Sequence, residues 1–232
     1  MVRRRSPSIQ AIIPAAGKGT RLKSSTPKPL VLLNGKPLLI YALNIFQKHP
    51  LIDSVVLVAP KPLISKFGKL LKKYRLTKVK AVVAGGKTRA ESVLNGLNQL
   101  DADTEIVVVH DAARPFIAPQ IITQAINACR REAAVIVAVP LKPTIKKVNA
   151  AGYVQATLNR RELWDVQTPQ IFKKEILQRA YRTVGDLNVT DEAALVERLG
   201  EKVKVVKGEY RNIKITTAED LLMAQLLLKR AQ

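Results

Sequence analysis

The sequence predicts an α/β protein with a mostly parallel sheet, helices on both faces of that sheet and a protruding β-arm. Short runs rich in β-branched residues recur along the chain, and segments with apolar residues at helical spacing separate them. Strands and helices that alternate in this way form parallel sheets covered on both sides. With 232 residues and 47% hydrophobic content, the chain can also bury a substantial core. We therefore expect a single domain over residues 1–232.

The elements follow from these patterns in chain order. The β-branched runs predict buried strands at residues 9–14, 55–59, 80–84, 106–110 and 133–140. Apolar residues at helical spacing predict helices within residues 39–46, 63–71, 92–100 and 121–129. Later in the chain, helices are expected at 173–184, 190–199 and 217–231, and a strand at 203–207. In the last helix, Thr217 and Asp220 form a candidate capping box.

The alternation lapses after Pro140, where the strand-like runs TIKKV and YVQATL flank a turn composition at residues 149–152. Two short runs around such a turn predict a β-hairpin, which we assign to an arm over about residues 140–162. A two-stranded hairpin is only marginally stable alone, so the arm must pack on its own domain or on a second subunit. We favour the second subunit and therefore expect a homodimer.

The composition narrows the possible partners. The chain has 39 Lys and Arg residues against 18 Asp and Glu, and this formal net charge of +21 favours anionic partners. The basic residues are spread along the chain and aromatic residues make up 4%, so phosphorylated small molecules are expected rather than nucleic acid. A basic nucleic-acid-binding module remains the alternative from a different functional class.

Two further features concern location and redox chemistry. No apolar run is long enough to span a membrane and the start lacks a signal peptide, so we expect a cytoplasmic protein with no membrane partner. The single cysteine excludes an intrachain disulfide or a CxxC metal site. Cys129 is expected to be a small core residue.

The loop from Ala15 to Lys28 is the first candidate site. Its segment GKGTR contains Gly17 and Gly19, which let backbone N–H groups approach phosphate oxygens closely, while Arg21 and Lys28 add positive charge. The loop is neither a Walker A motif nor a dinucleotide fingerprint, and an ordinary turn between strand and helix is the alternative. Two cations beside glycines without acidic neighbours repel each other unless an anion lies between them, so we predict that the loop binds phosphate.

The segment HDAARP follows the fourth predicted strand and is the second candidate site. Asp111 and Arg114 are expected at the carboxyl edge of the sheet, where open α/β sheets bind ligands. Asp111 can take a ribose hydroxyl, an acceptor hydroxyl or a water of Mg²⁺, and a purely structural pair with Arg114 is the alternative. His110 closes a strand of valines and is expected to be a neutral core histidine. The segment DAD at residues 101–103 is interpreted as a solvated turn.

Further glycines and cations complete the candidate site. Residues 85–92 (GGKTRAES) lie between a strand and a helix start, where N–H groups and Ser92 can contact a base. Arg160 follows the arm, and Lys214 in the segment NIKIT precedes the last helix. In isolation, these two cations are equally consistent with ordinary surface charge.

Seven segments, in this order and spacing, resemble the 2-C-methyl-D-erythritol 4-phosphate cytidylyltransferases of the non-mevalonate isoprenoid route. They are IIPAAGKGTRL, TPKPL, AGGKTRAESV, VVVHDAARPF, LNRRELWDVQTPQIF, VTDEA and NIKITTAEDL. The resemblance implies a Rossmann-like fold whose β-arm embraces a second subunit, so that each active site borrows residues from the partner's arm. It implies transfer of CMP from CTP to 2-C-methyl-D-erythritol 4-phosphate with release of pyrophosphate. Because the chain ends soon after NIKITTAEDL, a fused cyclase is not expected.

The resemblance also implies roles for individual residues. Arg21 and Lys28 would stabilise charge on the triphosphate, and Lys18 occupies a more variable position of the same loop. Mg²⁺ would bridge triphosphate oxygens, without a certain protein ligand. Contacts to cytosine and ribose are implied for Ala15, Ala16, Gly17, Gly86 and Ser92. The implied acceptor contacts are Asp111, Arg114, Lys214 and, from the partner's arm, Thr144 and Arg160.

Two positions depart from the family pattern. Pro29 stands where the family commonly has Gln, and Arg211 stands before NIK where an acidic residue is often found. The second departure affects the expected acceptor contacts more than catalysis. A ribitol 5-phosphate cytidylyltransferase, which shares the loop, HDAARP and NIKIT segments, is the alternative within the enzyme class.

Overall fold

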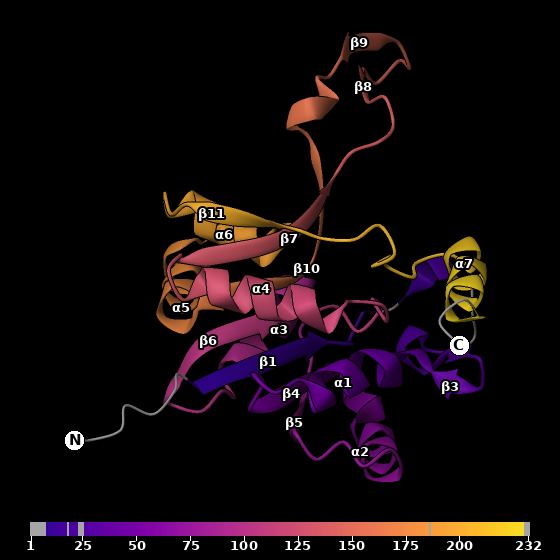
Figure 1. Cartoon of the computed structure of the whole chain (residues 1–232), viewed down its shortest axis with the longest axis vertical. Coiled ribbons are helices and arrows are strands. Elements are labelled where there is room, and N and C mark those ends of the chain that lie inside the picture. The colour runs from indigo at the N-terminus through magenta and orange to yellow at the C-terminus, as the bar shows by residue number, and fades with distance from the viewer. Residues whose placement is uncertain (1–7, 18, 23–25, 186, 230–232) are drawn as a thin grey trace.

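The computed structural model describes residues 8–17, 19–22, 26–185 and 187–229 of the chain. A seven-stranded sheet forms its centre, with the strands in the order β11-β7-β10-β6-β1-β4-β5 (Figure 1). All these strands run in the same direction except β10, which is antiparallel to both of its neighbours. The predicted mostly parallel sheet is therefore confirmed. Its strands are β1 (Ser8–Pro14), β4 (Ser54–Ala59), β5 (Val79–Ala84), β6 (Thr104–Val109), β7 (Ala134–Pro140), β10 (Trp164–Lys173) and β11 (Val203–Lys207).

Helices cover both faces of this sheet, and alternate residues of β1 belong to the two resulting cores. Ile9, Ala11 and Ile13 pack with residues of α1, α2 and α4, whereas Ile12 packs with residues of α3, α5 and α6. Successive side chains of a strand point to opposite faces, so one strand supplies both cores. The predicted helices are present with ends shifted by a few residues: α1 (Leu38–Lys48), α2 (Ile64–Lys73), α3 (Arg89–Leu97), α4 (Pro119–Cys129), α5 (Lys174–Thr183), α6 (Glu192–Arg198) and α7 (Ala218–Lys229).

Strand β10 is the central element that the sequence patterns do not predict. Gln167, Thr168 and Gln170 interrupt any apolar pattern, and Pro169 is expected at the edge of a sheet because it cannot donate a ladder hydrogen bond. In the structure these three polar residues are buried, and the pairing of β10 with β7 shifts register between Gln167 and Gln170. This irregularity accommodates Pro169 and brings polar side chains into the middle of the sheet.

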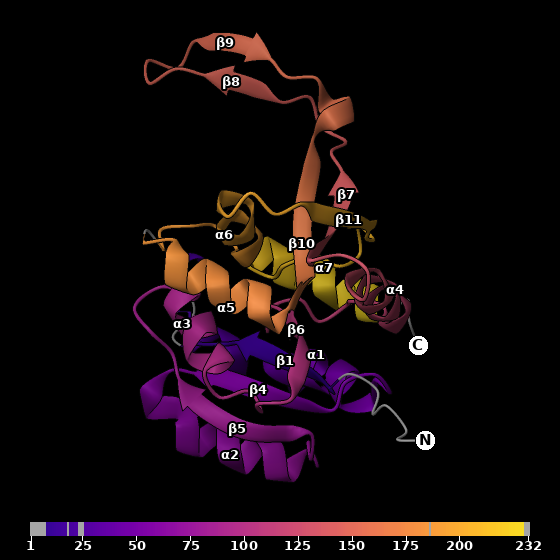
Figure 2. The same cartoon turned by 90° about the vertical axis from the view of Figure 1, so that its left-hand side faces the viewer.

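The predicted hairpin is present as β8 (Lys146–Val148) and β9 (Val154–Thr157), which pair in antiparallel orientation. In its turn, Gly152 adopts φ +87°, and the Asn149 side chain accepts hydrogen bonds from the N–H groups of Ala151 and Tyr153. The hairpin stands away from the seven-stranded sheet, beyond a stalk formed by β7 and β10 (Figures 1 and 2). All residues of β8 and β9 are exposed in this single chain.

The C-terminal segment returns to the carboxyl edge of the sheet. Ile215 donates its backbone N–H to the carbonyl oxygen of Ala113 at 2.9 Å. The predicted capping box is confirmed, because Asp220 Oδ2 accepts from the N–H of Thr217 at 2.9 Å and Thr217 Oγ1 accepts from the N–H of Asp220 at 3.3 Å. These contacts fix the preceding Lys214 beside the strand ends. The short elements are β2 (Leu32–Leu33), β3 (Lys36–Pro37) and the 3-10 helices η1 (Thr20–Leu22), η2 (Lys28–Leu30), η3 (Lys61–Leu63) and η4 (Arg160–Glu162).

The single cysteine lies in the core as expected. Cys129 is fully buried at the end of α4, and burial raises the pKa of its thiol to about 12. It is therefore protonated at neutral pH and acts as a small apolar residue. Within the described ranges, none of the helices is long and apolar enough to cross a membrane.

Candidate active site

A pocket of about 720 Å³ opens at the carboxyl ends of the parallel strands, where open α/β sheets bind ligands. The segments after β1, β5 and β6 line it, together with η1, η2 and the segment before α7. Residues far apart in the sequence therefore meet at the predicted edge. Lys18 lies outside the described residues. The predicted site residues that the pocket brings together are Ala15, Ala16, Gly17, Gly19, Arg21, Lys28, Gly86, Ser92, Asp111 and Lys214.

The path of the loop after β1 depends on Gly19, which adopts φ +64°. A Cβ atom at this position would lie 2.6 Å from the Cβ atom of Lys28, so glycine allows η1 and η2 to approach this closely. Arg21 is exposed in η1, and Lys28 is half-buried at the start of η2. Burial and, next, the positive charge of Lys214 lower the pKa of Lys28 to about 8. An anion in the pocket would stabilise this crowded cation.

The turn between β5 and α3 packs directly against the same loop. A Cβ atom on Gly85 would lie 2.3 Å from the Cβ atom of Ala16, so the two segments touch. The hydroxyl of Ser92 accepts a hydrogen bond from the N–H of Gly86 at 3.1 Å and donates to the carbonyl oxygen of Thr88 at 2.8 Å. Ser92 therefore orders the turn that lines the pocket.

Asp111, at the end of β6, lies among three cations. Its Oδ2 is 2.7 Å from Lys214 Nζ and 3.8 Å from Arg114 Nε, and its Oδ1 is 3.3 Å from Arg89 Nη2. The residue is only 6% exposed. Burial alone raises the pKa of this carboxyl group, but Arg89 and Lys214 together hold the pKa well below its ordinary value. Asp111 is therefore ionised at neutral pH and holds Lys214 at the pocket.

His110 is the neutral core histidine expected from the sequence. It is fully buried, and burial lowers the pKa of its ring to about 4. Its Nε2 lies 3.0 Å from the carbonyl oxygen of Arg114, and its Nδ1 lies 3.1 Å from Oγ1 of Thr168. Thr168 Oγ1 also accepts the backbone N–H of Asp111 at 3.0 Å. His110 thus supports the turn that carries Asp111 and is already fully bonded.

The other predicted acceptor contacts lie outside this pocket. Arg114 is 8% exposed, and its Nη1 donates to the carbonyl oxygen of Asn212 at 2.8 Å. Thr144 and Arg160 are exposed within the arm, where Arg160 donates to the carbonyl oxygen of Lys142 at 2.7 Å. The arm stands away from the loops that line the pocket of its own chain (Figures 1 and 2). The acceptor roles of these three residues therefore remain predictions.

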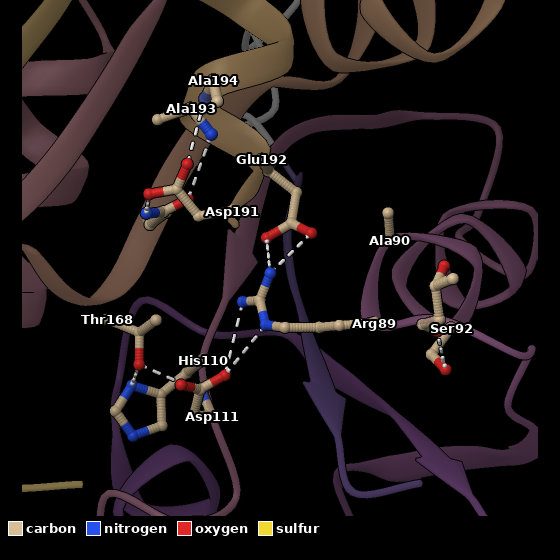
Figure 3. Close-up of polar contacts among 12 residues, drawn as sticks. Arg89, Ala90, Ser92, His110, Asp111, Thr168, Asp191, Glu192, Ala193 and Ala194 are labelled. Carbon is tan, nitrogen blue, oxygen red and sulfur yellow. Dashed lines mark hydrogen bonds and ion pairs between the residues drawn. The ribbon is translucent and has the colours of Figure 1, made fainter. Parts of the chain in front are cut away.

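Arg89 and Glu192 are site residues that the sequence patterns do not single out. Arg89 begins α3, and its Nη1 donates to both carboxylate oxygens of Glu192, at 2.6 and 2.8 Å (Figure 3). Glu192, which begins α6, is completely buried. Burial alone lowers the pKa of Arg89, but Glu192 and Asp111 raise it overall, so the guanidinium stays charged. The positive end of the helix dipole disfavours a cation. An arginine at a helix N-terminus therefore indicates that carboxylates lie nearby.

The carboxylates near the pocket do not form a metal site of their own in the part of the chain that the structure describes. The described residues contain no cluster of three or more His, Cys, Asp or Glu side chains that could hold a metal ion. Both oxygens of Asp111 already face cations. Asp101 and Asp103 are exposed between α3 and β6, as expected for a solvated turn, and Asp101 lies 3.2 Å from Lys80. A divalent cation would therefore bring most of its ligands with a bound phosphate chain.

The fold and this set of residues match a known family. The model of the family described as IspD: 2-C-methyl-D-erythritol 4-phosphate cytidylyltransferase matches residues 9–230 of the chain. The chain belongs to this family. The resemblance drawn from the seven segments is thus confirmed, and membership in the 2-C-methyl-D-erythritol 4-phosphate cytidylyltransferase family makes the chain a nucleotidyltransferase rather than a nucleic-acid-binding module.

Relatives of this cytidylyltransferase family match the chain over nearly its whole length. It is 44% identical over 229 residues to the enzyme of Syntrophus aciditrophicus, covering 97% of this chain and 98% of the relative. It is 47% identical over 225 residues to the enzyme of Alkaliphilus metalliredigens, with coverages of 96% and 93%. The crystal structure of 4-diphosphocytidyl-2C-methyl-D-erythritol synthase from Anaerococcus prevotii has a TM-score of 0.85 at 37% identity and covers 97% of both chains. The expected Rossmann-like fold is confirmed.

Proposed function

We propose that this chain transfers CMP from CTP to the phosphate of 2-C-methyl-D-erythritol 4-phosphate, giving 4-diphosphocytidyl-2-C-methyl-D-erythritol and pyrophosphate. The observation that supports it most directly is the gathering of Arg21, Lys28 and Lys214 around a glycine-lined pocket. Two polyanionic substrates repel each other, and fixed cations offset this repulsion as charge grows in the transition state. The names of the relatives supply the identity of the cytidylyl group and of the acceptor.

The acceptor phosphate is the nucleophile in this mechanism. A phosphate monoester has a second pKa of about 6, so it is largely a dianion at neutral pH and needs no general base. One of its oxygens forms a bond to the α-phosphorus of CTP in line with the leaving group. The bond from that phosphorus to the β-phosphate oxygen breaks, and pyrophosphate leaves with the electron pair. Arg21 and Lys28 stabilise the charge, and no covalent enzyme intermediate forms.

The remaining pocket residues divide between the two substrates. The nucleotide lies along the loop after β1 and the turn after β5, where Gly17, Gly19 and Gly86 let backbone N–H groups approach it. The acceptor lies beside Lys214, which Asp111 holds at 2.7 Å. Asp111 is shared, because it borders both regions. The contacts proposed for cytosine and ribose are those of Ala15, Ala16, Gly17, Gly86 and Ser92.

Mg²⁺ fits this pocket as a companion of the triphosphate. Asp111 is the carboxylate of the described pocket lining, and its two oxygens are already paired with cations, so the phosphate oxygens of CTP would supply most ligands. When bound, the ion adds positive charge at the phosphate oxygens during the displacement.

We expect the enzyme and its substrates in the cytoplasm, without membrane or nucleic-acid partners.

We also propose a homodimer in which the arm of each subunit completes the pocket of the other. Thr144 and Arg160 would then contact the acceptor from the partner's arm, with Arg160 and Lys214 positioning it for attack. The arm and stalk expose apolar side chains, of which Tyr153 is 73% exposed. Contact with a second subunit would remove this apolar surface from water. The exposed apolar residues are Val148, Tyr153, Val154, Leu158, Trp164 and Val166.

Binding of CTP should take up protons near pH 8. Lys28 has a pKa lowered to about 8 in the free pocket, and the triphosphate raises that pKa because it favours the charged form. At pH 8 we expect an uptake of about half a proton for each CTP bound, and an affinity that falls as the pH rises further. Calorimetry in buffers of different ionisation enthalpy measures this uptake. Lys28→Arg should abolish it, and an unchanged uptake in that variant would contradict the assignment.

Gly19→Ala should weaken CTP binding by about tenfold or more, because the new Cβ atom displaces Lys28 and the left-handed backbone is strained. Titration calorimetry measures the affinity. Gly35→Ala is the matched control, since Gly35 also has a positive φ of +74° but its Cβ atom would meet nothing within 4 Å. The control should lose similar stability and bind CTP normally. Equal effects of both changes on binding would argue against a specific role of Gly19.

A pyrophosphate-release assay tests the proposed function. The full-length chain is incubated with Mg²⁺, one of the four nucleoside triphosphates and a panel of sugar-alcohol phosphates. We expect release with CTP and 2-C-methyl-D-erythritol 4-phosphate above all other combinations. Preferred use of ribitol 5-phosphate would replace the acceptor, and the absence of release with every pair would overturn the proposal.

A further inference from the structure

Arg89 faces the pocket, yet its guanidinium is already bonded to two carboxylates (Figure 3). Nη1 donates to both oxygens of Glu192, while Nε and Nη2 each lie 3.3 Å from Oδ1 of Asp111. These contacts use most of the five N–H donors of an arginine side chain. Arg89 is therefore poorly suited to bind a phosphate group directly, although it is a cation in an anion-binding pocket.

Glu192 holds Arg89 in this position. Its carboxylate is completely buried. The hydroxyl oxygen of Tyr181 lies 3.4 Å from Oε1 of Glu192, and this hydroxyl donates to the carbonyl oxygen of Ala90 at 3.1 Å. A buried carboxylate is costly unless it is paired, so breaking the two short hydrogen bonds to Arg89 would carry a large free-energy cost. The guanidinium is thus fixed between α6 and the end of β6.

The two oxygens of Asp111 have separate partners. Oδ1 faces Arg89, whereas Oδ2 faces Lys214 at 2.7 Å. The terminal torsion of an aspartate side chain is soft, so hydrogen bonds determine how the carboxylate is turned. Arg89 occupies Oδ1 and thereby leaves Oδ2 directed at Lys214. Without Arg89, only Lys214 and Arg114, which both face Oδ2, would hold the carboxylate. Its orientation would no longer be fixed at Oδ1, and the position of Lys214 would change with it.

We propose that Arg89 is a positioning residue that orients Asp111 so that Lys214 is held on the acceptor side of the pocket. The inference rests on the proposed function, because Lys214 is there the residue that positions the acceptor. Binding of the acceptor and the geometry of its attack depend on Arg89. CTP is held by the loop after β1, by the turn after β5 and by Arg21 and Lys28. Its binding therefore depends much less on Arg89 than binding of the acceptor does.

The first test compares steady-state kinetics of Arg89→Met with wild type. We expect kcat/KM for the acceptor to fall by about 10- to 100-fold, since a small misplacement of a positioning group has effects of this size. The KM for CTP should stay within about twofold. Arg89→Lys should recover only part of the loss, because an ammonium group cannot bridge two carboxylates as the planar guanidinium does. The control is Arg179→Met. Arg179 lies on α5 and forms an ion pair with Glu201 away from the pocket, so its loss should leave the kinetics unchanged.

A second variant separates positioning from stability. Arg89→Met leaves Glu192 buried without its partner, so the denaturation midpoint should fall. The double variant Arg89→Met/Glu192→Gln removes that buried charge and should regain much of the midpoint, while kcat/KM for the acceptor stays low. Recovery of both quantities together would show that Arg89 only stabilises the fold and would overturn the inference. A rise in the KM for CTP with unchanged acceptor kinetics would overturn it as well.

Crystal structures of wild type and Arg89→Met test the inference without any assay of activity. We expect the contact between Asp111 Oδ2 and Lys214 Nζ to be lost in the variant. An intact contact at 2.7 Å would refute the positioning role even if the enzyme used a different acceptor. Failure of wild type to release pyrophosphate would instead refute the proposed function alone.

Discussion

Replacing Lys28 with alanine is expected to lower kcat by about 10²- to 10³-fold, the loss typical of removing one fixed charge-stabilising group. Lys28 is half-buried in the pocket, and a Cβ atom at Gly19 would lie 2.6 Å from the Cβ atom of Lys28, so the loop after β1 packs directly against this lysine. Lys28→Arg retains the charge and should keep more activity. Single-turnover measurements with saturating CTP separate this effect on chemistry from weaker binding.

The chain contains its own control for this substitution. The sequence Pro60-Lys61-Pro62-Leu63 is identical to that of residues 27–30, and both lysines begin a 3-10 helix after a proline. Lys61 is exposed and is not among the residues that line the described pocket, so Lys61→Ala should leave kcat unchanged. Arg21→Ala should lower kcat as strongly as Lys28→Ala. Turnover near that of wild type in Arg21→Ala would remove it from the assigned site.

Mixing two inactive variants should restore activity if the arm completes the partner's pocket. Lys28→Ala lacks a residue of the pocket, and Arg160→Ala lacks a residue of the arm. In a mixed dimer, one pocket has both defects and the other has neither. At equal mixing, we expect about one quarter of wild-type activity, because half of the dimers are mixed and half of their pockets are intact. Co-expression with two affinity tags isolates the mixed dimer.

The matched control combines Lys28→Ala with Lys214→Ala, two residues that line the same pocket. Every pocket of that mixed dimer carries one defect, so its activity should stay at the level of the parents. If the pair with Arg160→Ala stays equally inactive although mixed dimers are isolated, the shared pocket is wrong and Arg160 acts within its own chain or not at all. A monomer at assay concentrations by sedimentation would exclude the dimer itself.

Most of the fold could be predicted from the sequence because strands buried on both faces carry long apolar runs. In β1, for example, Ile12 packs in one core while its neighbours Ala11 and Ile13 pack in the core on the other face of the sheet. The exception is β10, where Gln167 and Gln170 occupy positions in the middle of the sheet. Gln170 donates to Asp191 at 2.7 Å and accepts from the N–H of Ala193 at 3.2 Å, so its polar group is satisfied by residues more than twenty positions away. Such partners leave no periodic signal.

The same limit applies to the site. Glycines, lysines and the segment HDAARP indicated the pocket because their chemistry is local to each loop. The role of Arg89 depends on Glu192, which is 103 positions away along the chain and reaches Arg89 only when the fold brings the start of α6 to the pocket (Figure 3). A single sequence does not show which residues so far apart along the chain come into contact. The acceptor contacts of the arm are harder still, since they involve a second copy of the chain.

Strand β10 runs from the stalk to the turn that carries Asp111. Trp164 pairs with Pro140 where the stalk begins, and four residues later Thr168 accepts the backbone N–H of Asp111. Four residues of extended chain span only about 13 Å. A displacement of the arm would therefore reach the hydrogen bond beneath Asp111 through four residues of a single strand. A molecule that bound the arm would act, through this short segment, on the residue that holds Lys214.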